Sequence, residues 1–133
     1  MGENPTRQTA ELKRRFVVAA LAIALTVLAG CTRPTTDQST LKAIKAECQA
    51  LMMIPPIEST TDPDVPKSRW PHVIASLKPE FVMILSQGVF ITVKPYFDGG
   101  WGYFVPRSKG DRPPPGDPQF SEIGQGVYWF HPY

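Results

Sequence analysis

Two neighbouring apolar runs constrain the fold most. FVMILS at 81–86 and VFITVK at 89–94 alternate side chains between two faces, with Gln87-Gly88 between the runs. Because glycine adopts positive φ at little cost, this dipeptide favours a tight turn between antiparallel strands. With Ser86 paired to Val89, we expect one hairpin face in the core, namely Val82, Ile84, Val89, Ile91 and Val93. The opposite face, which we expect to be partly covered, holds Phe81, Met83, Leu85, Phe90, Thr92 and Lys94.

Helical periodicity precedes the hairpin. A helix is predicted over about 40–53, with Ser39 or Thr40 as its cap and two prolines after its end. Its apolar positions recur at helical spacing, and they are Leu41, Ile44, Cys48 and Leu51. Cys48 is therefore expected to be a small core residue. A second, short helix is predicted over 68–78.

Further strands are predicted after the hairpin, at 101–105 and 126–131. The proline-rich segment 106–118 between them is predicted to lack regular structure. This order predicts an α+β fold, in which an N-terminal helix and a short second helix pack on a small antiparallel sheet of three to four strands. We expect a single domain over 39–133.

The first thirty residues differ from the rest. Four basic residues precede an apolar run at 16–29, which small residues terminate. As a helix this run spans roughly 22 Å, too short for a hydrocarbon core about 30 Å thick, so residues 1–30 are predicted to be a secretory signal. Residues 31–133 carry ten basic and ten acidic side chains, and this balance argues against nucleic acid as a partner.

The signal ends at Leu28-Ala29-Gly30-Cys31, which resembles the lipobox of bacterial lipoproteins. The resemblance implies cleavage between Gly30 and Cys31 and attachment of a thioether-linked lipid to Cys31. Residues 31–38 then form a lipidated cysteine and a short tether. Because Thr32 rather than aspartate follows the cysteine, the family's sorting rule implies the inner leaflet of the outer membrane, facing the periplasm. The membrane is thus an expected partner, through two or more buried acyl chains.

Catalytic constellations are sparse in the mature chain. The two histidines, His72 and His131, have no acidic residue at helical spacing, so no metal site is predicted and no cofactor is expected. Most carboxylates lie in turns or beside proline, where they commonly act as local caps. We therefore expect a non-enzymatic protein.

Aromatic residues are concentrated in the C-terminal third. The segments GGWGYFVPR and GVYWFHPY resemble those of small envelope lipoproteins, a resemblance that implies no activity. Adjacent aromatics must point to both sheet faces, so one set packs inward. The other set either packs against a helix or the proline-rich segment or forms a candidate binding surface, for which the residues are Trp101, Tyr103, Tyr128 and Trp129. The expected partner is an envelope protein. The alternative is a cell-wall glycan, bound or weakly hydrolysed with the help of Asp98 or Glu122.

Overall fold

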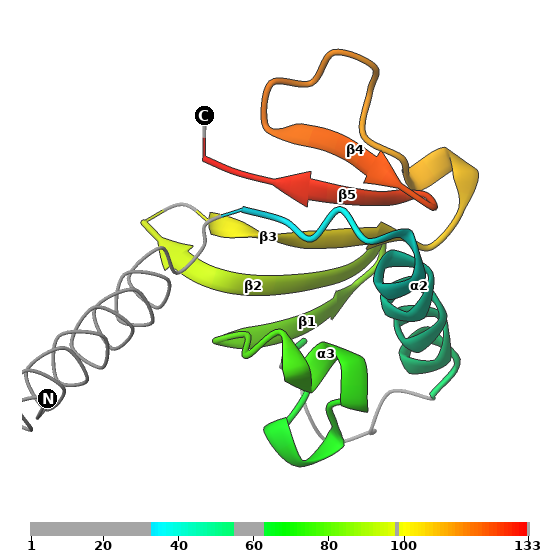
Figure 1. Cartoon of the computed structure of the whole chain (residues 1–133), viewed down its shortest axis with the longest axis vertical. Coiled ribbons are helices and arrows are strands. Elements are labelled where there is room, and N and C mark those ends of the chain that lie inside the picture. Colours follow the sequence, from blue (N-terminus) through cyan, green and yellow to red (C-terminus); the bar gives the residue numbers. More distant parts are fainter. Residues whose placement is uncertain (1–32, 55–62, 98, 133) are drawn as a thin grey trace, which may run out of the picture. The chain divides into compact units, whose positions relative to one another are not determined.

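The computed structural model describes residues 33–54, 63–97 and 99–132 (Figure 1). The chain divides into two units after Cys31, and the described elements belong to the second unit, Thr32–Tyr133. The helical elements are α2 (Gln38–Met53), η1 (Lys67–Arg69), α3 (His72–Ser76) and η2 (Lys109–Asp111). The strands are β1 (Phe81–Leu85), β2 (Gly88–Tyr96), β3 (Gly99–Pro106), β4 (Phe120–Gly124) and β5 (Val127–Phe130). None of the described helices is long and apolar enough to cross a membrane.

The predicted α+β class is confirmed, but the sheet has five strands rather than three to four. All neighbouring strands are antiparallel, in the order β1-β2-β3-β5-β4. The strand absent from the prediction is β4, whose FSEIG sequence contains only two large apolar residues. It is short and lies at a sheet edge, where pairing with β5 rather than intrinsic propensity holds it.

The β1–β2 hairpin has the predicted faces but a different register. Leu85 pairs with Gly88, so Ser86 and Gln87 form the turn, and the predicted Ser86–Val89 pairing is wrong. Gly88 lies inside β2, where a Cβ would overlap the carbonyl oxygen of Val105 on β3. The register differs by two residues, which leaves every side chain on its predicted face up to Thr92.

A β-bulge between Thr92 and Lys94 changes the face of the residues that follow. Lys94 pairs with Trp101, and its Nζ lies 5.1 Å from the centre of that ring. Trp101 packs against the main core, on the sheet face that the helices cover. Lys94 therefore lies on that face too, whereas the alternation predicted it on the face of Phe90. An inserted residue breaks the period of two, and nothing in the local sequence marks it.

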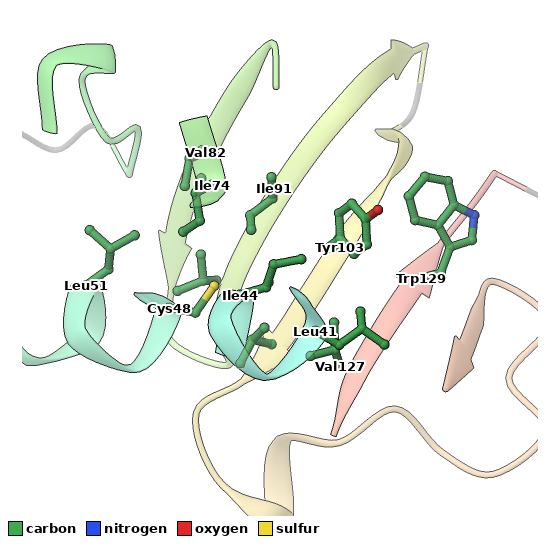
Figure 2. Packing of buried hydrophobic residues seen from close by; sticks show 12 residues of the cluster. Leu41, Ile44, Cys48, Leu51, Ile74, Val82, Ile91, Tyr103, Val127 and Trp129 are labelled. Atoms are coloured by element: carbon green, nitrogen blue, oxygen red, sulfur yellow. The ribbon is translucent and has the colours of Figure 1, made fainter. Parts of the chain in front are cut away.

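The main core lies between the helices and one face of the sheet (Figure 2). The predicted apolar stripe of α2 is confirmed, because Leu41, Ile44, Cys48 and Leu51 are all buried. Ile74 of α3 is buried beside them. The sheet contributes Val82, Val89, Ile91, Tyr103, Val105, Val127 and Trp129.

Helix α2 begins two residues earlier than predicted, and Asp37 caps it rather than Ser39 or Thr40. The Asp37 carboxylate accepts hydrogen bonds from the Ser39 hydroxyl at 2.6 Å and from the Thr40 hydroxyl and amide at 2.6 and 2.8 Å. These bonds favour the ionised form, and they lower the pKa of Asp37 from 3.8 to about 2.

Glu47 joins the two helices. Its two carboxylate oxygens accept hydrogen bonds from the backbone amides of Val73 and Ile74, each at 2.9 Å. These amides lie in the first turn of α3, where the helix offers them no carbonyl partner. Glu47 therefore caps α3 from a neighbouring helix, a role that its polar position on α2 did not predict.

The Asp37 cap predicts a pH-dependent contribution to stability. Because the folded-state pKa is lowered, the contribution is present above pH 3.8 and is lost as the pH falls through about 2. Asp37→Ala should lower the melting temperature at pH 7 and flatten its decline between pH 4 and 2. Asp37→Asn, which keeps an acceptor but cannot ionise, should stay near the wild type at pH 7 and show the same flattening. Thermal unfolding followed by circular dichroism measures both effects, and an unchanged slope in both variants would contradict them.

Glu47 provides a second prediction. Glu47→Ala leaves two half-buried amides of α3 without an acceptor and should destabilise the protein by about 1–3 kcal/mol. Glu47→Gln retains one acceptor oxygen and should lose less. Urea unfolding of both variants measures the difference. Glu122→Ala, at an exposed position on β4, is the control.

An apolar groove on the second face of the sheet

The predicted aromatic surface does not exist as an exposed platform. Tyr103, Tyr128 and Trp129 have exposed fractions of only 4%, 8% and 6%. Trp101 is half-buried beneath the Lys94 side chain. Burial rules out the binding-surface alternative for these three residues, because the adjacent aromatics of β3 and β5 fill both faces of the sheet rather than exposing one.

Tyr103 instead fixes the chain before α2. Its ring contacts Trp129 edge-on, with a centroid distance of 5.1 Å, and its hydroxyl accepts a hydrogen bond from the Thr35 amide at 2.9 Å. Burial raises the pKa of the Tyr103 phenol, which keeps this hydroxyl neutral. The predicted tether is therefore held against the domain at Thr35, several residues before the helix was expected to begin.

The second face of the sheet carries its own aromatic cluster. Phe104, Tyr128 and Phe130 are buried there, with Phe90 and Phe120 partly buried around them. The rings of Phe90 and Phe104 stack at 4.5 Å, and Phe130 meets Phe90 edge-on at 5.6 Å. No helical residue belongs to this cluster among the described segments. The aromatic rings themselves thus cover the strands on this side.

Gly102 allows the rings to lie against the strands. It pairs directly with Phe130, and a Cβ at Gly102 would lie 2.8 Å from the Cζ of that ring. The same Cβ would also overlap the carbonyl oxygen of Ile91 on the neighbouring strand. The position therefore requires glycine for close approach.

A groove of about 650 Å³ lies beside this cluster. Phe81, Met83 and Leu85 of β1 form one wall, and all three are half-buried. Phe90, Thr92 and Phe130 line it from the central strands. The remaining lining comes from the β2–β3 turn and the chain ends, namely Tyr96, Phe97, Gly99, Gly100, Gln119, Phe120, His131 and Pro132.

The lining is chemically simple. Its polar side chains are Thr92, Tyr96, Gln119 and His131, and no carboxylate occurs among the described lining residues. The backbone amide of His131 donates to the Gln119 carbonyl at 3.0 Å, which holds the C-terminal segment beside β4. No described group of histidine, cysteine and acidic residues is arranged to hold a metal ion. The groove can bind an apolar group, but these lining residues provide no acid–base pair.

Of the residues proposed for glycan hydrolysis, only Glu122 is described by the structure, and it does not line the groove. Glu122 is exposed on β4, opposite Tyr128, and is absent from the lining. Asp98 lies outside the described residues, as do Leu28, Ala29, Gly30 and Cys31 of the predicted lipobox.

The sequence identified half of the groove. The second hairpin face was expected to be partly covered, and Phe81, Met83, Leu85 and Phe90 are indeed half-buried. The wall formed by Gln119, Phe120 and Pro132 was missed, because it depends on the pairing of β4 with β5. The only available signal was the presence of large apolar residues on both hairpin faces.

Gly102 gives a test of this packing. Gly102→Ala should destabilise the protein by about 1–3 kcal/mol, since the methyl group forces Phe130 or β2 to move. Urea unfolding measures the loss. The matched control is Gly110→Ala, where a Cβ would meet only the Ser108 Oγ at 3.6 Å and should cost little. Equal losses in the two variants would contradict the role given to Gly102.

Comparison with protein-family models, with curated proteins and with solved structures finds no match for this chain.

Proposed function

We propose that the protein is a lipid-anchored, non-enzymatic module of the bacterial envelope that binds an apolar segment of another envelope protein. The observation that carries the binding role is the apolar groove on a sheet face to which no described helix contributes. The lipobox sequence ending at Cys31 carries the anchoring role. With Thr32 after that cysteine, we place the anchor in the inner leaflet of the outer membrane, facing the periplasm.

The groove suits a protein partner better than a glycan. Its volume of about 650 Å³ is in the range of ordinary ligand sites, and its lining is mainly apolar. Met83 and Leu85 are half-buried, so part of their apolar surface still contacts water. An apolar side chain that binds in the groove removes this surface from water, which favours binding. A sugar needs hydrogen-bonding groups for its hydroxyls, and the described lining offers few of them.

The groove can be tested by site-specific crosslinking in cells. A photo-reactive amino acid in place of Met83 should give a discrete adduct with another envelope protein. The same residue in place of Gln49, exposed on α2, should not. Met83→Glu should abolish partner binding in the purified protein while circular dichroism stays unchanged. An adduct whose size falls on muramidase digestion would favour the glycan alternative, and identical patterns from both positions would contradict a groove-specific partner.

The anchor can be tested by counting thiols. Cys48 is buried, and burial is the main reason that its pKa is raised to about 12, so maleimide should not label it in the folded protein. If Cys31 carries a lipid, the reduced mature protein should show no reactive thiol when folded and one when denatured. A reactive thiol in the folded mature protein would contradict lipidation.

The cleavage site has its own test. Cys31→Ser should leave an unprocessed precursor without lipid. The lipobox resemblance implies that the lipid is attached to the Cys31 sulfur and that cleavage requires this attachment. Cys48→Ala should leave processing and localisation unchanged and reduce stability modestly. Mass spectrometry of the N-terminal peptide distinguishes the two forms. Normal cleavage of the Cys31→Ser precursor would overturn the lipoprotein assignment.

A further inference from the structure

Large exposed apolar side chains occur at two places in the described chain. Among the described residues, the large exposed hydrophobics are Tyr96 and Phe97 at the β2–β3 turn and Met53 and Ile54 at the end of α2. Phe97 is the most exposed of them, at 95%. Tyr96 and Phe97 are adjacent, and contiguous exposed apolar side chains can mark a contact surface.

Three aromatic rings and one lysine lie at the β2–β3 turn. The Tyr96 ring lies 5.6 Å from both the Phe97 and the Trp101 rings. The Lys94 Nζ lies 5.1 Å over Trp101. We call these four residues, Lys94, Tyr96, Phe97 and Trp101, the hairpin tip. Tyrosine and tryptophan favour the boundary between lipid and water, and lysine can extend its charge to the headgroups there.

The chain before α2 leads toward the hairpin tip. Gln38 lies at the opposite end of the sheet, where its side chain accepts a hydrogen bond from Gln125 in the β4–β5 turn. Thr35 contacts Tyr103 in the middle of β3. The segment therefore runs along β3 toward the β2–β3 turn, as Figure 1 shows for the residues that precede α2.

The covalent reach from Thr35 is short. Cys31 precedes Thr35 by four residues, which span at most about 14 Å when fully extended. Gly99 precedes Tyr103 by four residues in β3, and it lies about 13 Å away along the strand. A lipid on Cys31 thus keeps the bilayer within reach of the hairpin tip. Met53 is separated from the start of α2 by the length of that helix, about 24 Å.

We propose that the hairpin tip inserts into the membrane interface as a second contact beside the lipid anchor, and this inference rests on the lipidation of Cys31. Phe97 enters the acyl-chain boundary, Tyr96 and Trp101 lie at headgroup level, and Lys94 faces the lipid phosphates. A domain held by both the lipid anchor and the hairpin tip cannot rotate freely about the tether. The groove, whose lining includes Tyr96 and Phe97, then opens beside the membrane surface.

The test uses the mature lipidated protein in phosphatidylcholine–phosphatidylglycerol vesicles, with and without bromine on the acyl chains. An environment-sensitive fluorophore is attached to a cysteine at Phe97→Cys. Met53→Cys, whose native side chain is 84% exposed, is the matched control. Lipid blocks Cys31 and burial protects Cys48, so each variant carries one reactive thiol. We expect a blue shift and a loss of fluorescence to bromine at position 97, and neither change at position 53.

The outcomes separate this inference from the anchor. A mature protein that lacks lipid by mass spectrometry overturns both together. A lipidated, vesicle-bound protein with no fluorescence loss at position 97 overturns only the hairpin contact. Loss at position 53 without loss at 97 also overturns it, because the α2 end would then face the bilayer. Circular dichroism verifies that both labelled proteins remain folded.

Discussion

The packing of α2 on one face of the sheet is the interaction on which the rest of the structure depends. Leu41, Ile44, Cys48 and Leu51 cover the aliphatic face of the hairpin and the inner face of β3 and β5. The sheet, however, has two apolar faces and the described chain provides only one helical layer. The second face must therefore be covered by its own side chains or by another molecule.

Large aromatic rings cover most of the second face. Rings from β2, β3, β4 and β5 contact one another across the strands and bury Phe104, Tyr128 and Phe130. The covering ends at β1, where Phe81, Met83 and Leu85 stay half-buried and border the groove. The proposed binding site thus lies at the margin of the aromatic cluster, between its Phe90 and Phe130 rings and the side chains of β1.

Tyr103 connects the core with the proposed anchor. Its ring belongs to the main core and its hydroxyl holds the Thr35 amide, so the chain leaves the domain at a defined place on β3. A tether held in this way limits the orientations available at a membrane. The hairpin tip and the groove share Tyr96 and Phe97 at the β2–β3 turn.

The sequence alone determined the local structure. Apolar residues at helical spacing predicted the buried face of α2 and the burial of Cys48, and the alternation at 81–92 predicted both hairpin faces up to the bulge. These predictions succeeded because helix and strand periods are local properties, and a two-residue register change preserves strand faces. The charge balance of residues 31–133 can also be counted without a structure, and the resemblance of Leu28-Ala29-Gly30-Cys31 to a lipobox stays a prediction.

Tertiary structure decided what depends on pairing between distant strands. The bulge after Thr92 follows from the pairing of β2 with β3. The edge strand β4 and the burial of Tyr103, Tyr128 and Trp129 follow from how β3, β5 and β4 align. An aromatic residue in a strand has the same sequence signature whether it faces a core or solvent. What packs on each side of the sheet determines which face is filled and which forms a groove, and the strand pattern alone does not show this.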